Sequence, residues 1–244
     1  MMCAIFLRKA LVRLRWMIRM VIIHGSSDSE RRLLDKLPNE VRSMDDMHKV
    51  KEDFKHKHKN ASGWFAGLKR WNYRRQIDKI DRGMKDPLRA GADGEKNMLD
   101  ILTVLDDSYH VFCDLHVVLP YTVRYNGQKN LRSAQMDLVV ACLKGIFLIE
   151  VKNWSDRYAM NPGWSPHEQT ERAGRVLWIA LQNSVGEVRV TNILLSMRGN
   201  IRYDSNYRSV WVSDPDRIVG FLEGKPDTLT QPDLTRILTK LNKL

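Results

Sequence analysis

The sequence predicts an α/β protein in which helices flank a mixed β-sheet, with a basic and mainly helical extension at the N-terminus. Three observations lead to this prediction. Apolar runs of strand length alternate with amphipathic stretches in the second part of the chain, two of these runs are spaced to form a β-hairpin, and the positive charge is concentrated in the first part. We therefore expect an extension over residues 1–88 and one domain over residues 89–244.

The distribution of charge supports this division. Residues 1–90 contain 22 Lys and Arg against 11 Asp and Glu, whereas residues 91–244 contain 18 of each kind. The first segment therefore accounts for the whole net charge of +11. Pro87 and the glycines of the stretch KDPLRAGADG mark the expected boundary.

The first residues form an apolar stretch that five cations interrupt, which argues against a transmembrane helix. Arg8, Arg15 and Arg19 follow one another at the spacing of one face of an amphipathic helix. Residues 1–24 are thus expected to lie on a membrane surface, to pack on a protein partner or to form an oligomer interface. The three cysteines form no Cys-x-x-Cys pair, which favours a reducing, cytoplasmic location, with peripheral membrane attachment as an option.

The basic segment that follows interleaves its cations with aromatic residues over residues 49–75. Cations neutralise phosphates and aromatic faces stack on bases, so this composition is typical of nucleic-acid binding. The alternative is a pair of helices whose aromatic residues pack on the domain while the charges are merely solvated. The candidate nucleic-acid contacts are Lys55, Lys57, Lys59, Lys69, Arg70, Arg74 and Arg75.

A helix is expected from about residue 93 to residue 105, followed by a strand in HVFCDLHVV. Glu95 precedes Leu99 and Leu102 by four and seven positions, so it lies on the apolar stripe of this helix. A carboxylate that faces inward indicates a site. The alternative is an acid of the first turn that interacts with the helix dipole.

The runs AQMDLVVACLKG and GIFLIEVKNWSD are expected to form a β-hairpin. With Lys144 and Gly145 as the two turn residues, Asp137 would lie across from Lys152 and diagonal to Glu150. Two carboxylates and a lysine would then converge, and a slip of one residue would separate them.

Further elements follow the hairpin. A helix is expected after the N-cap Ser165, two strands in VRVTNILLS and SVWVSD, and a closing helix capped by Thr230.

Two carboxylates on rigid strands suit a hard cation such as Mg²⁺ or Mn²⁺, which binds oxygen ligands and keeps several waters. A lysine adds positive charge without competing for the metal. Such a cluster can stabilise the charge of an in-line displacement at phosphorus, so the chemistry indicated is phosphodiester hydrolysis.

Asp137 followed by Glu150-Val151-Lys152 resembles the signature of PD-(D/E)xK nucleases, and QMD followed by GIFLIEVKNW resembles their nuclease-related domain (NERD) branch. The order of GADGE, HVFCDLHVV, the two hairpin runs and SPHEQ extends the resemblance over residues 89–244. It implies a restriction-endonuclease-like core with Asp137 and Glu150 as metal ligands. It also implies that Lys152 positions or activates the attacking water and that Glu95 contributes to the same site. Residues with a supporting or substrate-binding role would be Gln135, Asn153 and Gln169.

The function predicted is metal-dependent hydrolysis of nucleic acid, with DNA as the expected substrate. Two alternatives remain at this point. The chain could be a nucleic-acid-binding module with weak catalysis, or a membrane-associated adaptor organised by its N-terminal helix.

Overall fold

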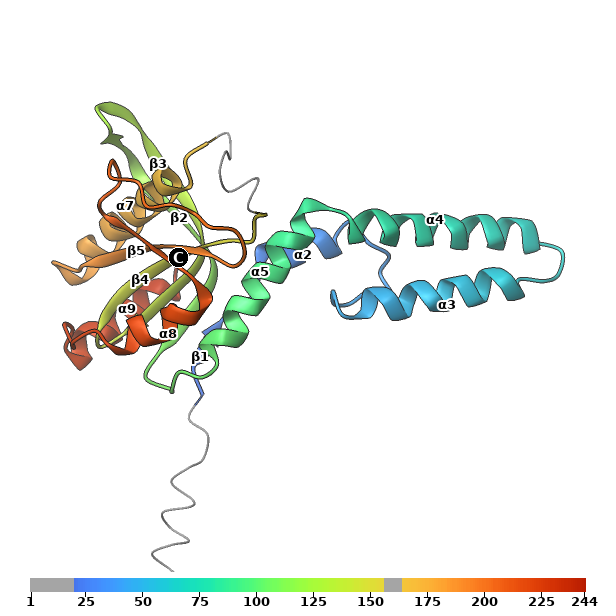
Figure 1. Cartoon of the computed structure of the whole chain (residues 1–244), viewed down its shortest axis with the longest axis horizontal. Coiled ribbons are helices and arrows are strands. Elements are labelled where there is room, and N and C mark those ends of the chain that lie inside the picture. Colours follow the sequence, from blue (N-terminus) through green and yellow to red (C-terminus); the bar gives the residue numbers. More distant parts are fainter. Residues whose placement is uncertain (1–19, 156–163) are drawn as a thin grey trace, which may run out of the picture.

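The computed structural model describes residues 20–155 and 164–244 (Figure 1). At its centre lies a six-stranded sheet whose strands follow one another in the order of the sequence. The strands are β1 (Ile22–His24), β2 (His110–Tyr125), β3 (Gln128–Cys142), β4 (Gly145–Lys152), β5 (Val190–Ser196) and β6 (Val210–Ser213). β2, β3 and β4 form an antiparallel meander, whereas β1 runs parallel to β2, and β5 and β6 continue parallel to β4. The predicted mixed sheet is confirmed.

Helices cover both faces of this sheet. The helices of the described residues are α2 (Asp28–Leu34), α3 (Asp46–Asn60), α4 (Ala66–Met84), α5 (Pro87–Leu102), α7 (Pro166–Val185), α8 (Pro215–Glu223) and α9 (Gln231–Leu241). α7 and α9 share one apolar core with the sheet, and α5 and α8 share another on the opposite face. None of the helices in the described part of the chain is both long and apolar enough to cross a membrane.

Helix starts agree with the capping residues that the sequence offers. Ser165 accepts a hydrogen bond from the Glu168 amide (3.1 Å), and Thr230 forms a capping box with Asp233, as expected. α5 begins earlier than predicted, because Asp86 caps it and Pro87 occupies the first turn. A proline near the expected boundary therefore starts a helix instead of ending a segment.

The hairpin of β3 and β4 is formed, but its register differs from the expected one. Cys142 pairs with Gly145, so Leu143 and Lys144 are the turn residues. Gly145 has a φ of +135°, which favours glycine and suits the residue that closes the turn. The pairing is shifted by two positions, and this even shift leaves every side chain on its predicted face.

The N-terminal segment contributes to the sheet. Residues 22–24, where an amphipathic helix was expected to end, form β1 and pair with residues 110–112. The prediction of a helix is wrong for these residues, because the β-branched pair Ile22-Ile23 adds to the edge of β2. Residues 1–19, including the predicted arginine face, lie outside the described residues.

α3 and α4 form a helical hairpin, residues 46–84, that projects away from the sheet and is called the arm below (Figure 1). A small core joins the base of the arm to α2 and α5. Its buried members include Leu33, Met47, Phe54, Ile80 and Ala92. The projecting part is thus shorter than the predicted extension, since β1 and α2 lie against the sheet and α5.

Candidate active site

A pocket of about 590 Å³ lies where the carboxyl end of β4 meets the first turns of α5. A smaller pocket of about 140 Å³ adjoins it on the side of α2. Ser29, Glu95 and Asp137 line both pockets, and Lys152 and Asn153 line the larger one. The structure therefore places three of the four predicted catalytic side chains around one cavity.

Asp137 and Glu150 come from adjacent strands. Leu138 pairs with Ile149, so the next residues, Asp137 and Glu150, face each other where the ladder ends. One carboxylate oxygen of Asp137 accepts the Val151 amide at 2.8 Å. Burial, and then the negative charge of Glu150, raises the pKa of Asp137 to about 7. The expected neighbour of Asp137 was Lys152, and the two-position shift in register is the reason for the difference.

Glu150 is only 1% exposed and lies behind the pocket wall. Its Oε1 contacts the Lys152 ammonium at 2.5 Å, whereas its Oε2 is buried and has no hydrogen-bond partner. Burial acts against the charged form of Lys152, but the carboxylates of Glu150 and Asp137 outweigh it, so the pKa of Lys152 is raised. The lysine is therefore held as a cation, and one buried carboxylate oxygen remains unsatisfied.

Glu95 approaches the pair from α5. The hydroxyls of Ser27 and Ser29 both donate to its carboxylate, the latter at 2.5 Å. Burial, and then the charge of Asp137, raises the pKa of Glu95 above its ordinary value. Glu95 thus faces the site, and its position within α5 is well beyond the first turn, which removes the helix-dipole alternative.

Close contact between α5 and the end of β4 depends on Gly94. A Cβ at this position would lie 2.7 Å from the Cβ of Asn153. The Asn153 amide also donates to the Ala90 carbonyl at 2.7 Å. Asn153, predicted as a supporting residue, therefore ties the strand that carries Glu150 to the helix that carries Glu95.

Asp114 is a site residue that the sequence analysis missed. Cys113 pairs with Leu138 and Leu115 with Met136, which sets Asp114 opposite Asp137. Its φ of +53° is unusual for a non-glycine residue. The sequence does single out this position, because Asp114 is the one acidic residue in the apolar run HVFCDLHVV.

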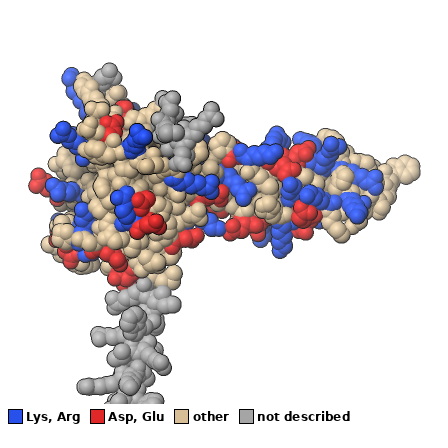
Figure 2. Space-filling model, in the orientation of Figure 1, with Lys and Arg blue, Asp and Glu red and all other residues tan. Residues whose placement is uncertain are grey.

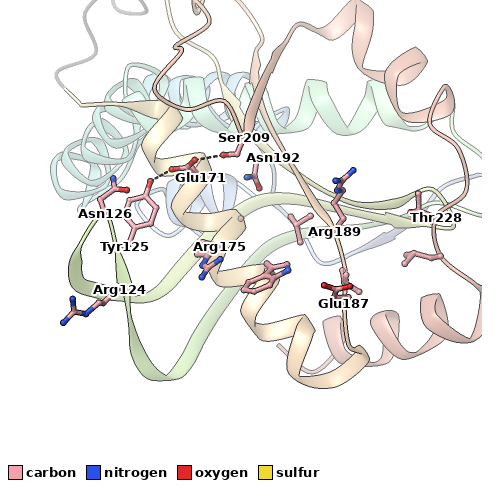
Figure 3. Close-up of a pocket in the computed structure, with 15 residues that line it drawn as sticks. Arg124, Tyr125, Asn126, Glu171, Arg175, Glu187, Arg189, Asn192, Ser209 and Thr228 are labelled. Carbon is pink, nitrogen blue, oxygen red and sulfur yellow. Dashed lines mark hydrogen bonds between the residues drawn. The ribbon is translucent and has the colours of Figure 1, made fainter.

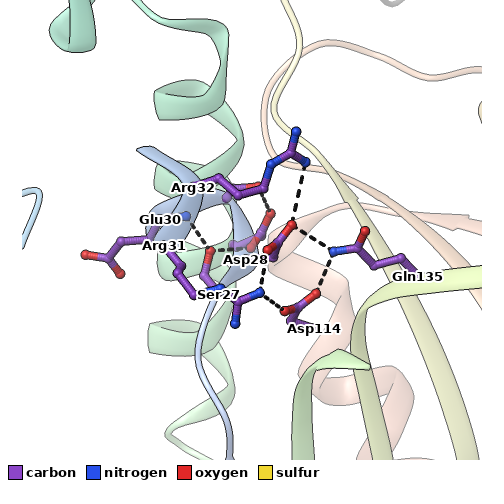
Figure 4. Close-up of polar contacts among 9 residues, drawn as sticks. Ser27, Asp28, Glu30, Arg31, Arg32, Asp114 and Gln135 are labelled. Carbon is purple, nitrogen blue, oxygen red and sulfur yellow. Dashed lines mark hydrogen bonds and ion pairs between the residues drawn. The ribbon is translucent and has the colours of Figure 1, made fainter. Parts of the chain in front are cut away.

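A polar network connects Asp114 to α2 (Figure 4). Gln135 donates to Asp114 at 2.6 Å and to Asp28 at 2.9 Å, and Arg31 bridges the same two carboxylates. Burial acts to raise the pKa of Asp28, but the hydrogen bond from Gln135 and the guanidinium of Arg31 hold it below its ordinary value. Gln135 thus lines the smaller pocket, and its supporting role stays a prediction.

Residues 90–197 match the family described as the nuclease-related domain (NERD), which belongs to the PD-(D/E)xK-like nuclease superfamily. This segment is a nuclease-related domain. The match spans α5 to β5 and contains every predicted catalytic residue, but it ends before β6, α8 and α9. No curated protein and no solved structure gave a match.

Domains of this superfamily generally use divalent metals. Within residues 20–155 and 164–244, no three or more His, Cys, Asp or Glu side chains are gathered into a ready-made metal-binding group. The nuclease-related domain instead offers the facing carboxylates of Asp137 and Glu150. Mg²⁺ is commonly bound by one or two carboxylates and keeps water on its other positions. The free Glu150 Oε2 and the raised pKa of Asp137 fit a site that a cation would complete.

Gln169 lies on the first turn of α7 and lines the smaller pocket of the nuclease-related domain. Its side-chain oxygen is buried without a hydrogen-bond partner. An unsatisfied amide beside the acidic cluster fits the predicted supporting role, which stays a prediction.

The seven cations predicted to contact nucleic acid all lie on the arm and are exposed. None of them lines either pocket of the active site. Figure 2 shows basic side chains along the arm, where acidic ones are interspersed near its base. Contact between these cations and nucleic acid stays a prediction.

A separate hollow of about 830 Å³ lies beside α7, away from the acidic cluster (Figure 3). The Glu171 carboxylate lines this hollow and accepts hydrogen bonds from the Tyr125 hydroxyl at 2.6 Å and from the Ser209 hydroxyl at 2.5 Å. Arg175 stacks over the Trp178 ring at 4.5 Å. The polar groups of Tyr125, Glu171 and Ser209 are therefore paired with one another. The hollow has no lining residue in common with the active-site pockets.

Proposed function

We propose that the nuclease-related domain hydrolyses phosphodiester bonds of nucleic acid with the help of a divalent cation, Mg²⁺ or Mn²⁺. One observation carries the proposal. Two carboxylates from neighbouring strands, Asp137 and Glu150, face each other beside a lysine that is held as a cation, and one of their oxygens is buried without a partner. A buried carboxylate oxygen without a partner is costly, and a bound cation would satisfy it.

Each residue has a task that its position allows. Asp137 and Glu150 would hold the cation, which when bound supplies a Lewis acid for the phosphate and a more acidic water. Lys152 would position the attacking water and balance the negative charge that develops at phosphorus. Glu95, fixed by Ser27 and Ser29, would orient water from the opposite wall of the pocket.

The proposal is supported further by access to the site. The larger pocket opens beside Trp154 and Ser155, and the Lys152 ammonium lies 5.7 Å from the Trp154 ring and 5.3 Å from the Trp164 ring. Aromatic rings beside a catalytic lysine can stack on the bases that flank the phosphate to be cleaved. DNA is the substrate we propose to test first.

The test is cleavage of labelled single- and double-stranded DNA and RNA in the presence of Mg²⁺, Mn²⁺ or a chelator. We expect cleavage that depends on the metal, and Lys152→Ala should lower the rate by about 10²–10³. Lys243→Ala removes an exposed lysine after α9 and serves as the matched control, with an unchanged rate. Equal rates in the two variants would contradict the role of Lys152.

The alternative of a binding module with weak catalysis makes a different prediction in the same assay. Such a protein would bind the substrates but cleave none of them with either metal. Intact carboxylates at positions 95, 137 and 150, together with Lys152, favour the enzyme.

A further inference from the structure

The tip of the arm exposes a cluster of large apolar side chains. Within the described residues, Trp64 is 96% exposed, Phe65 and Leu68 are each 64% exposed, and Trp71 is 54% exposed. Leu68 and Trp71 lie three positions apart on the first turns of α4, and Trp64 and Phe65 lie in the turn that leads into this helix. Figure 1 places this tip at the end of the arm that is farthest from the sheet. A contiguous exposed apolar patch of this kind marks an interaction surface.

The charge around the tip is uniform in sign. Residues 54–75 contain seven Lys and Arg and no Asp or Glu. The acids of the arm lie nearer its base, where Asp81 forms an ion pair with Lys51 at 2.5 Å. The outer half of the arm therefore presents apolar side chains at its end and positive charge immediately behind them.

We propose that the tip of the arm inserts into the headgroup region of an anionic lipid membrane. Helices that bind at a membrane interface combine Trp, Phe and Leu on one face with flanking Lys and Arg. Tryptophan also favours the boundary between headgroups and acyl chains. The tip has both features, and its surrounding charge is complementary to anionic lipid.

The dimensions of the arm agree with this proposal. From Phe65 to Arg75 the helix rises about 15 Å, so all cations of the outer half lie within about that distance of the tip. A headgroup layer is about 5–8 Å thick, and the membrane charge acts over a further 8 Å or so at physiological ionic strength. Every one of these cations would be within reach of the lipid charge when the rings touch the acyl boundary.

Nucleic acid is the competing partner for a basic surface, and the tip fits it less well. Bases stack on ring faces, but the Arg75 guanidinium already covers a face of Trp71 at 4.7 Å. Leu68, which lies between Trp64 and Trp71 in the sequence, offers no planar surface to a base. The active-site pockets lie at the opposite end of the arm, so a membrane-bound tip would hold them above the lipid and open to solvent (Figure 1).

The test is co-sedimentation of the full chain with vesicles of phosphatidylcholine alone or mixed with phosphatidylglycerol. We expect binding to the mixed vesicles, and at least a tenfold loss of affinity in Trp64→Ser/Phe65→Ser. Tyr121→Ser/Tyr203→Ser, which removes two exposed rings elsewhere, should bind as the unmodified chain does. All variants keep residues 1–19, so any lipid binding by that segment is common to them.

Two further measurements sharpen the test. Lys57→Glu/Lys59→Glu should weaken binding to the mixed vesicles by tenfold or more, because each lysine near an anionic surface contributes about fivefold. Trp64→Phe should keep the binding but lose part of the vesicle-induced blue shift of tryptophan emission. Circular dichroism checks that these exposed substitutions leave the fold intact.

Three outcomes would overturn the proposal. Vesicle affinity could be unchanged in both arm variants. The arm variants could lose affinity for labelled DNA while no variant binds vesicles, which would make the tip a nucleic-acid surface. Light scattering could show a dimer that dissociates in Trp64→Ser/Phe65→Ser, which would make a second copy of the chain the partner.

Discussion

At the scale of single residues, the chemistry of the site depends on negative charges held close together. Asp137 faces Asp114 on one side and Glu150 on the other, and Glu95 approaches from the helix above them. Burial, and then these neighbouring charges, raise the pKa values of Asp137 and Glu95. Lys152 supplies one positive charge, and the remaining imbalance is what a divalent metal would correct.

Metal binding is the first prediction at this scale. Asp137→Ala should abolish Mn²⁺ binding or weaken it severely, because Glu150 alone gives a hard cation too few fixed oxygen ligands. Titration calorimetry of the purified protein measures the affinity. Asp216→Ala, which removes an acid from the first turn of α8, is the control and should bind Mn²⁺ normally. An unchanged affinity in Asp137→Ala would contradict the assignment of this ligand.

The pKa of Asp137, raised to about 7 from 3.8, predicts how stability depends on pH. Between these values the folded chain binds a proton that the unfolded chain has released, so this carboxyl lowers stability as the pH rises from about 4 to about 7. Asp137→Asn removes that contribution. In the presence of a chelator, the free energy of unfolding of the variant should exceed that of the unmodified protein by about 1–4 kcal/mol across this pH range. Above this range the difference should be constant.

Urea denaturation at a series of pH values measures this difference. Comparison of the two proteins at each pH cancels the titration of distant groups that they share, such as the buried His167. Two stability curves that run parallel from pH 4 to pH 8 would show that Asp137 titrates normally.

At the scale of elements, the site depends on how closely α5 approaches the end of β4. Gly94 permits this approach, and Asn153 locks it through its hydrogen bond to Ala90. α2 adds a second restraint, because Ser27 and Ser29 at its start bind Glu95. Three elements that are far apart in sequence therefore fix one carboxylate.

Gly94→Ala tests this arrangement. The new Cβ would lie 2.7 Å from the Cβ of Asn153, which is too close to its backbone to swing away, so α5 must shift. We expect a loss of about 1–3 kcal/mol in stability together with reduced cleavage, because Glu95 moves with the helix. Gly220→Ala in α8, where a Cβ meets nothing within 4 Å, should instead stabilise the protein slightly. Thermal denaturation and the cleavage assay measure both effects.

At the scale of the whole molecule, the sheet and the arm have separate cores. The buried residues of the two sheet cores come from the sheet, its covering helices and the adjoining loops, whereas the core at the base of the arm joins the arm to α2 and α5. Beyond Phe54, most side chains of the arm are exposed. The outer half of the arm therefore adds charge and surface but little to the stability of the nuclease-related domain.

Replacing residues 56–72 by a short glycine-containing turn tests this separation. Phe54 and Tyr73, which pack at the base, are retained. The shortened chain should fold with a melting temperature close to that of the full chain and should cleave short substrates at the same rate.

The same variant tests the predicted nucleic-acid contacts, since it lacks Lys57, Lys59, Lys69 and Arg70. If these cations bind phosphates, DNA affinity should become less dependent on salt. An unchanged salt dependence in the folded variant would exclude them as phosphate contacts. Unfolding of the shortened chain would show that the arm is part of the domain's core.

The sequence alone determined the sheet hairpin, the inward position of Glu95, the caps of α7 and α9 and the set of catalytic candidates. These are local properties, because strand alternation, helical spacing and capping act over a few residues. The faces of β3 and β4 were predicted correctly even though the turn was misplaced, since a shift of two positions preserves the face.

Only the tertiary structure decided which residues complete the site. Asp114 joins Asp137 through pairing between strands, Ser27 and Ser29 reach Glu95 from 66 or more positions away, and Ile22–His24 become a strand because β2 offers a free edge. None of these contacts has a local periodicity, so no pattern in the sequence specifies them. The exposure of the rings at the tip of the arm was also decided only by the tertiary structure. Composition shows that aromatic residues are present, but packing decides which of them remain exposed.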